Sequence, residues 1–344
     1  MPAKSKRPRR LAAVAVTAAV GVGIGSTLAF LPLSAYSFSP GDAIPVQRQI
    51  SVSGEPAVKG QGSILMTDVL LTQLTPLTWI VDQFNSSVDI YPASEIFGGT
   101  DPAQLNKLQI GQMVDSKTAA VMAAYSLVHL PLQQIDGAQI VATVSGANSK
   151  LHIGDVITAV NGKRVTTAQA AAKAVDAAGT TVSLSITRPQ SAVGKPSTLV
   201  VSVTKFTHDG KKVVGVALTD GLVLKLQRPV TIATGQIGGP SAGLAFTLGI
   251  LQSLGVLHVP PGATVAATGT MDPQGQVGDV GGVRQKAIAV ARNGAKVFLV
   301  PPQEVTAAQS ADQKGLAIVP VTTLRGAIDY LVSHHLATFD PGAA

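Results

Sequence analysis

The sequence predicts an α+β protein preceded by one membrane-spanning helix. Three observations support this prediction. Residues 11–33 contain no charged residue, residues 130–206 have the pattern of a small domain of strands with one helix, and residues 207–344 alternate strands with helices. Alternation of both element types is typical of α/β and α+β layer architectures. At 344 residues the chain is long enough for two domains.

The first 33 residues differ in composition from the rest. Residues 1–10 form a basic segment with five basic residues and no acidic one. Residues 11–33 would form a helix of roughly 35 Å, which can cross a bilayer. The alternative is a cleaved signal peptide, but its apolar core is usually about 7–15 residues, and Leu33 fits poorly at the −3 position of a cut after Ala35. The basic flank predicts a single-pass protein of the cell membrane with a cytoplasmic N-terminus and with everything after residue 33 outside the membrane.

Composition excludes several function classes. The net charge is +7, and the five basic residues of the N-terminal segment leave only +2 for the remainder, so no nucleic-acid partner is expected. Cysteine is absent, which excludes disulfides, cysteine nucleophiles and thiolate metal sites. No G-x-x-x-x-G-K-[ST] loop occurs, so no ATPase module is expected. We predict neither a cofactor nor a metal.

Residues 36–128 are expected to form a membrane-proximal region. Residues 36–46 (YSFSPGDAIPV) have the composition of a turn-rich segment that leads away from the membrane. Two strands are predicted at residues 46–52 and 63–71. A long helix with small apolar residues is predicted at 105–128.

The string IGDVITAVNGKRV lies at residues 153–165, where a Gly-Asp pair enters a strand that ends in Asn-Gly. It resembles the bacterial PDZ domain, and the resemblance covers about 75 residues of the segment 130–206. The resemblance implies a peptide bound as an added strand at a sheet edge, in a groove beside the predicted helix Ala168–Ala177. An inert spacer domain is the alternative, and LPLQQIDG shows no clear carboxylate-binding loop.

The C-terminal region holds the candidate chemistry. We expect strands within residues 212–233, helices at 242–254, 283–292 and 322–334, strands at 263–271 and 295–302, and a glycine-rich loop at 272–282.

Ser241 follows a Gly-Gly-Pro turn at the start of a predicted helix. It can serve as the helix N-cap, or as a nucleophile whose oxyanion is stabilised by the free N–H groups of the helix start. As a nucleophile it needs a base. Lys286 lies at the edge of the apolar stripe of the predicted helix 283–292, and desolvation would lower its pKa. It can therefore act as the base, or lie over apolar surface with its amine in water.

A second hypothesis rests on residues 239–243, which satisfy the G-x-S-x-G pattern of α/β-hydrolases. That fold needs an acid and a histidine after the serine. His334 or His335 would have to supply the histidine. Only 103 residues follow Ser241, so this hypothesis is the weaker one.

A family resemblance favours the Ser–Lys pair. The stretches GGPSAGLAFTLGIL and ATGTMDPQGQVGDVGGVRQKAIAVARNGAKVFLVPPQE resemble the proteolytic domain of Lon-type serine proteases. The resemblance implies that Ser241 is the nucleophile and Lys286 the general base, that Thr268 orients the amine, and that Gly239 supports the site. One departure is that Ile237-Gly238 replaces the usual Lys-Asp pair.

Two earlier stretches, KGQGSILMTDVLL and IGQMVDSKTAAVMAAYSLV, are similar to the part of Lon proteases that precedes the serine. The resemblance therefore implies a Lon-type domain split in sequence, with residues 36–128 as its first part, 207–344 as its second and the PDZ-like segment 130–206 inserted. The whole order is similar to the membrane-anchored PDZ–Lon proteases of bacteria.

This resemblance implies an ATP-independent serine endopeptidase that cleaves unfolded or flexible extracytoplasmic protein segments, selected in part by the PDZ groove. The protein or peptide substrates are its expected partners, together with the membrane at residues 11–33. A homo-oligomer is compatible with the resemblance. The alternative from another class is a non-catalytic PDZ scaffold on a Lon-like fold.

Overall fold

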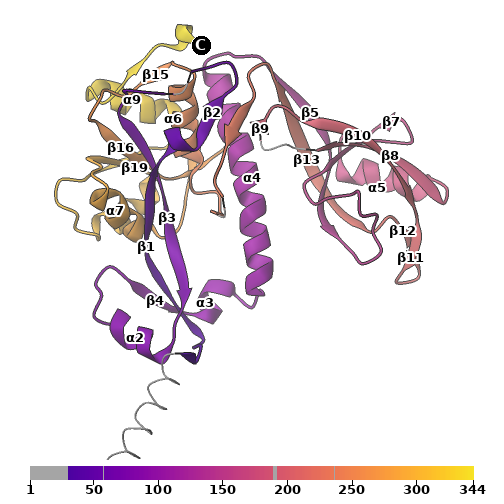
Figure 1. Ribbon diagram of the computed structural model, residues 1–344, viewed down its shortest axis with the longest axis horizontal. Coiled ribbons are helices and arrows are strands. Elements are labelled where there is room, and N and C mark those ends of the chain that lie inside the picture. The colour runs from indigo at the N-terminus through magenta and orange to yellow at the C-terminus, as the bar shows by residue number, and fades with distance from the viewer. Residues whose placement is uncertain (1–29, 57, 189–191, 236) are drawn as a thin grey trace, which may run out of the picture.

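Two six-stranded sheets organise the residues that the computed structural model describes, which are 30–56, 58–188, 192–235 and 237–344. Figure 1 shows them in two bodies, with the long helix α4 (Pro102–Leu127) beside the larger one. Both parallel and antiparallel pairs occur, so the α+β class is confirmed. The predicted span at 11–33 lies almost wholly outside the described residues. No helix in the described part of the chain is both long and apolar enough to cross a membrane.

The first sheet combines strands from two distant parts of the chain. Its order is β20 (Ala317–Pro320), β19 (Val297–Val300), β16 (Thr264–Ala267), β3 (Ser63–Gln73), β1 (Ala35–Pro45) and β4 (Asp89–Pro92). β16 pairs in parallel with both β19 and β3, so the C-terminal strands continue directly into the N-terminal hairpin. This sheet is therefore discontinuous in sequence, with residues 132–226 between its parts.

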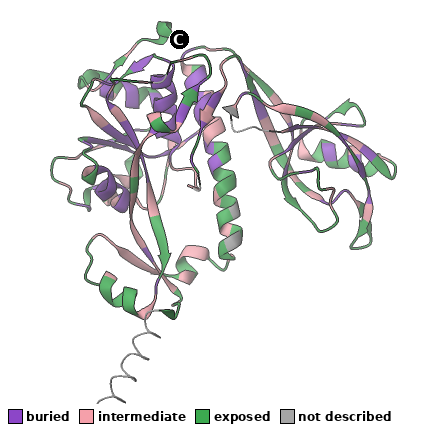
Figure 2. Cartoon of the chain, viewed as in Figure 1, coloured by how far each residue is buried: buried purple, intermediate pink, exposed green. Residues whose placement is uncertain are grey.

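Two helices cover opposite faces of this sheet. Val265 and Leu299 pack with α6 (Gly243–Ser253), whereas Ala266 and Phe298 pack with α7 (Val283–Arg292). Neighbouring residues of a strand point to opposite faces, so consecutive apolar residues on β16 and β19 serve both helices. The purple interior in Figure 2 coincides with this sandwich.

The segment 36–46 is not the turn-rich stretch that the sequence predicts. It forms β1, which pairs antiparallel with β3 along most of its length. The ladder shifts register between Pro40 and Ala43, and such a bulge accommodates proline and glycine within a strand. Residues 46–52, predicted as one strand, are a 3₁₀ turn (Val46–Arg48) followed by the short β2 (Ile50–Val52).

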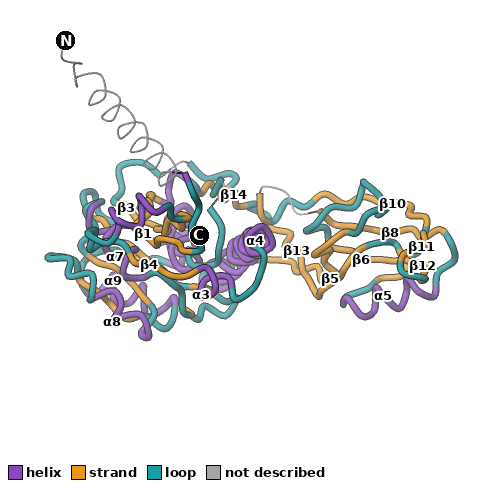
Figure 3. The backbone as a smooth tube through the Cα atoms, turned by 90° about the horizontal axis from the view of Figure 1, so that it is seen from below, coloured by secondary structure: helices purple, strands orange, loops and turns teal. Residues whose placement is uncertain are grey.

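The second sheet has the order β10 (Ser197–Thr204), β8 (Thr181–Arg188), β6 (Val156–Val160), β5 (Leu132–Thr143) and β13 (Val216–Leu226), with β7 (Lys163–Arg164) on β6. Helix α5 (Ala168–Ala177) packs on it through Ala171 and Val175. The strands and helix predicted in this segment are confirmed. Figure 3 shows this sheet extending away from the first, with α4 between them.

The remaining elements are short. They are α2 (Pro76–Asp82), α3 (Ala93–Phe97), α8 (Val305–Gln309), α9 (Leu324–Ser333), β9 (Ala192–Val193), β11 (Phe206–His208), β12 (Lys211–Val213), β14 (Val230–Ile232), β15 (Leu257–His258), β17 (Thr270–Met271), β18 (Val277–Gly278) and β21 (Thr338–Phe339).

Candidate active site

Ser241 lies just before α6, a helix in which all eleven residues are buried. The N-cap of that helix is Ala242, and no side chain caps it. Ser241 is therefore not the N-cap of α6, which was one of the two roles considered for it. Its carbonyl oxygen accepts hydrogen bonds from the Gly269 N–H at 2.9 Å and from the Thr268 hydroxyl at 3.1 Å. These bonds fix the backbone that carries the Ser241 hydroxyl.

Lys286 is buried within α7, with 2% of its surface exposed. The amine does not reach water over apolar surface, because its Nζ donates to Thr268 Oγ1 at 3.3 Å. Burial disfavours the ammonium form and lowers the Lys286 pKa to about 8, although Glu304 and Asp68 oppose this shift through their negative charges. A substantial fraction of the amine is therefore neutral at mildly alkaline pH and able to accept a proton.

Thr268 connects the two residues. Its side chain is fully buried immediately after β16, where the hydroxyl donates to the Ser241 carbonyl and accepts from Lys286. Within the described part of the chain, no hydrogen bond joins the Ser241 hydroxyl to Lys286 directly. Bonds between catalytic groups are commonly long before substrate binds and tighten in the complex. The structure thus brings Ser241, Thr268 and Lys286 into one chain of contacts.

The N-terminal hairpin supplies one wall of the site. A cavity of about 20 Å³ adjoins Ser241, and its lining comes from β1, β3, α4 and the loop before α6. The residues that line it are Asp42, Ile44, Met66, Thr67, Asp68, Met113, Ile237, Gly238, Ser241 and Ala242. A volume of this size accommodates about one water molecule.

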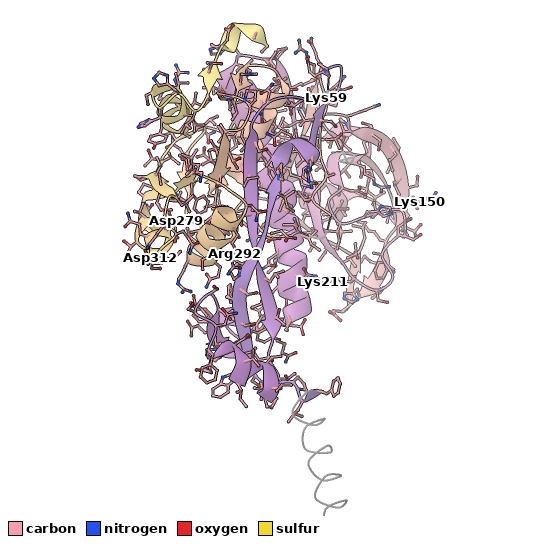
Figure 4. The ribbon with its side chains drawn as sticks, turned by 60° about the vertical axis from the view of Figure 1, so that its left-hand side comes forward. Lys59, Lys150, Lys211, Asp279, Arg292 and Asp312 are labelled. Carbon is pink, nitrogen blue, oxygen red and sulfur yellow. The ribbon has the colours of Figure 1, made fainter. Side chains whose placement is uncertain are left out.

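Two carboxylates near the amine did not stand out in the sequence. Burial raises the pKa of Asp68, against the effect of its hydrogen bond from the Asp42 N–H at 2.7 Å. Burial also raises the pKa of Glu304, and the neighbouring charge of Asp279, in the loop before α7, acts in the same direction (Figure 4). Asp68 is the single charged residue of β3, which was the one signal available in the sequence.

The backbone around Gly239 determines which N–H groups are available. Gly239 has a φ of 85°, in the left-handed region that favours glycine, and an added Cβ would meet no atom within 4 Å. Its N–H donates to the Gln109 carbonyl of α4 at 2.8 Å and so is occupied. The N–H groups of Ser241 and Ala242 donate to no other described residue. These two groups, at the positive end of α6, are suited to hold an oxyanion.

The histidines of the hydrolase hypothesis lie away from this site. His334 and His335 are exposed after α9, and His334 stacks on the Tyr330 ring with a centroid separation of 4.0 Å. Within the described part of the chain, neither makes a hydrogen bond to Ser241. The described residues also contain no cluster of histidines and carboxylates that could hold a metal ion.

The peptide groove was predicted beside α5, and β13 is an edge strand of the second sheet. Helix α5 packs against β13, and the Ala168 N–H at its start donates to Asp220 Oδ1 at 2.7 Å. Gly194 bridges to β13 at Lys225, whereas no described strand pairs with the outer edge of β13 before that residue. The free edge beside α5 is therefore that of β13, whereas residues 132–137 of LPLQQIDG pair with β13 as part of β5.

The open edge continues into a larger cavity that the sequence did not predict. This cavity, of about 720 Å³, lies between α4 and β13. Its lining includes Ala119 and Met122 from α4, residues 219–224 from β13 and residues 231–235, which lead toward Ser241. The cavity therefore lies between α4 and the second sheet.

Comparisons with known proteins agree with the chemistry of this site. Residues 230–333 match the family model of the Lon protease (S16) C-terminal proteolytic domain, and this range contains Ser241, Thr268 and Lys286. Among curated proteins, the Lon protease of Neorickettsia sennetsu is 29% identical over 98 residues, which are 28% of this chain and 12% of that protein. Lon protease 1 of Hydrogenovibrio crunogenus is 38% identical over 86 residues, or 24% of this chain and 10% of that protein. These matches support a serine peptidase.

The matched regions are limited in extent. The chain spans about a tenth of the length of these curated relatives. Among solved structures, the PDZ domain of the SdrC-like protein from Listeria monocytogenes aligns with 24% of this chain and 86% of its own length. The identity is 19% and the TM-score is 0.20.

Proposed function

Starting from the match to a Lon-type proteolytic domain, we propose that this protein is a membrane-anchored serine endopeptidase that acts without ATP through a Ser241–Lys286 dyad. The observation that carries the proposal is the buried, partly neutral Lys286 amine linked through Thr268 to the backbone of Ser241. A serine hydroxyl is a weak nucleophile without a base, and in this site the lysine is the candidate base.

In the proposed mechanism, the Ser241 hydroxyl attacks a peptide carbonyl carbon while neutral Lys286 takes its proton. The carbonyl oxygen becomes an oxyanion, which the N–H groups of Ser241 and Ala242 hold. The Lys286 ammonium then returns the proton to the leaving amine, and the peptide bond breaks to give an acyl-enzyme. Water, deprotonated by Lys286, attacks the ester, and the returned proton regenerates the Ser241 hydroxyl. Thr268 positions the amine throughout.

The substrate class follows from what the chain contains. The phosphate-binding motif of an ATPase is missing from the sequence, so a folded substrate would not be unfolded by this chain itself. We therefore propose that unfolded segments, tails and flexible loops are cleaved. The open edge of β13 beside α5 supports a PDZ-like mode of substrate selection, in which the peptide adds as a strand. The uncharged residues 11–33 are the proposed anchor, and the basic residues before them support a catalytic region outside the cell membrane.

The test compares cleavage of fluorescently labelled unfolded casein by the full chain in detergent with cleavage by three variants. Ser241→Ala and Lys286→Met should each abolish cleavage. Lys296→Met should not, because this exposed lysine lies outside the site. Full activity in Lys286→Met would refute the dyad, and full activity in Ser241→Ala would refute the serine mechanism. A folded wild-type chain that binds casein without cutting it would favour the non-catalytic scaffold.

A further inference from the structure

Helix α2 has a well-capped start, yet it contributes no buried side chain to a core. Thr75 forms a capping box with Thr78, and Pro76 occupies the first turn, so the helix start is well determined. None of its seven residues is buried, although four are large and apolar. Leu77, Trp79, Ile80 and Val81 remain 50%, 41%, 49% and 59% exposed. A helix that is apolar on all sides normally belongs in a core or in contact with lipid.

The residues around α2 extend this apolar surface. Leu70 and Leu71 on β3, Phe84 after α2, and Phe30 and Leu31 ahead of β1 are also exposed. We call these five residues and the four of α2 the apolar tip. Backbone bonds hold its parts together, because the Leu33 N–H donates to the Leu74 carbonyl and the Leu74 N–H donates to the Ala35 carbonyl. In Figure 2 this end of the molecule, at the bottom of the view, is mainly exposed.

The apolar tip is unlike the rest of the described surface. It contains nine of the seventeen large hydrophobic residues that are exposed among the described residues. Residues 70–84 hold a single charged residue, Asp82, and no basic one. Contiguous apolar surface of this kind marks a binding surface for protein or membrane.

We propose that the apolar tip inserts into the outer leaflet of a phospholipid bilayer, at the boundary between headgroups and acyl chains. The chain enters the tip at Phe30 and Leu31, which belong to the uncharged segment 11–33 that we propose as the anchor. A bilayer crossed by that segment would lie directly against α2. Tryptophan prefers this boundary, and Trp79 is at the centre of α2. This inference rests on the anchoring part of the proposed function.

Insertion of the tip would set the height of the active site above the bilayer. Asp68 on β3 lines the cavity at Ser241, and Leu74, directly after β3, makes the backbone bonds that hold the tip together. These two positions are six residues apart, which is about 20 Å in a strand. Pairing with β1 keeps this stretch extended. Ser241 would therefore work within about 20 Å of the membrane surface, so its substrates would be segments that emerge close to the bilayer.

The only tryptophan of the chain is Trp79, so its fluorescence reports on the tip alone. The full chain, carrying Ser241→Ala to prevent self-cleavage, is reconstituted in phosphatidylcholine vesicles with or without brominated acyl chains. Bromine quenches tryptophan on contact, whereas iodide quenches it from water. We expect strong quenching by brominated lipid and weak quenching by iodide. The control is the double variant Trp79→Phe and Val200→Trp, whose tryptophan lies exposed on β10 and should show the reverse pattern.

Three outcomes would overturn the inference. A chain that floats with the vesicles while Trp79 behaves like the control tryptophan refutes insertion and leaves the anchor intact. Shielding of Trp79 from both quenchers assigns the tip to a second copy of the chain and not to lipid. A chain that fails to float with vesicles refutes both the anchor and the tip, and casein cleavage in detergent then shows separately whether the protease proposal survives.

Discussion

Replacing Lys286 by methionine should stabilise the protein while it abolishes activity. Burial lowers the pKa of this lysine from its ordinary 10.5 to about 8. Each pKa unit corresponds to about 1.4 kcal/mol, so carrying the charged amine in the folded state costs about 3 kcal/mol at neutral pH. Methionine has a similar length and no charge to desolvate. At pH 7 the free energy of unfolding should therefore rise by up to about 3 kcal/mol in Lys286→Met.

The pH dependence gives the sharper test. Between pH 8 and 10.5 the unfolded wild type binds more protons at Lys286 than the folded one, so wild-type stability rises with pH in this window. Above pH 10.5 the lysine is neutral in both states, and the difference between wild type and Lys286→Met should shrink to a small constant. Below pH 8 the difference should be largest and level.

The measurement is urea unfolding of both full-length proteins in the same detergent, followed by circular dichroism from pH 7 to pH 11. Lys296→Met is the matched control, because it removes the same charge from an exposed position and should show no comparable trend. Parallel stability curves for wild type and Lys286→Met across this range would show that Lys286 is not held with a lowered pKa. The proposed base would then lose its physical basis.

Three further predictions concern activity. Thr268→Val removes the hydroxyl that accepts a hydrogen bond from the Lys286 amine, so the alkaline rise of kcat/KM, expected near pH 8 in the wild type, should move about 1 pH unit lower. Thr268→Ser keeps the hydroxyl and should keep the wild-type pH profile, and identical profiles for the two variants would argue against the contact. Asp68→Asn removes a charge that raises the Lys286 pKa, so pH–rate profiles should shift in the same direction, and a shift to higher pH would contradict this. Ala119→Trp should fill part of the cavity between α4 and β13, so cleavage of casein should slow several-fold while short fluorogenic peptides are cut at the wild-type rate. Equal losses of activity on both substrates would show that the cavity does not guide long chains.

The positions of the catalytic candidates within the fold were the most predictable part of the molecule, and their roles stay predictions. The helix predicted at 283–292 has the same bounds as α7, because its apolar periodicity and the terminating Gly294 are local signals. The apolar stripe of this helix predicted that Lys286 lies at the edge of the core, and in the structure the Lys286 side chain is buried. The family motif supplied Thr268, which no periodicity would have selected. Its link between Ser241 and Lys286 is a finding of the structure.

The wall of the site was not predictable, because its contacts are distant in sequence. Pro40 and Gly41 indicated a turn, yet they form a bulge in β1 that pairing with β3 stabilises. Asp68 and Met113 reach Ser241 only through the packing of this hairpin and α4 on the C-terminal strands. The apolar residues of α2 would be assigned to a core by their composition. Their exposure becomes visible only once the hairpin is seen to extend beyond the body.

The hairpin of β1 and β3 therefore reaches the candidate site at one end and the apolar tip at the other. One end lines the cavity at Ser241 and contributes the charge of Asp68 to the field at Lys286. The other end carries α2 and the exposed residues next to the proposed anchor. Because β3 runs without a break between these ends and β1 pairs with it on both sides of the bulge, a displacement at the bilayer would be transmitted to the wall of the site. Detachment of the apolar tip should then alter which substrates reach Ser241.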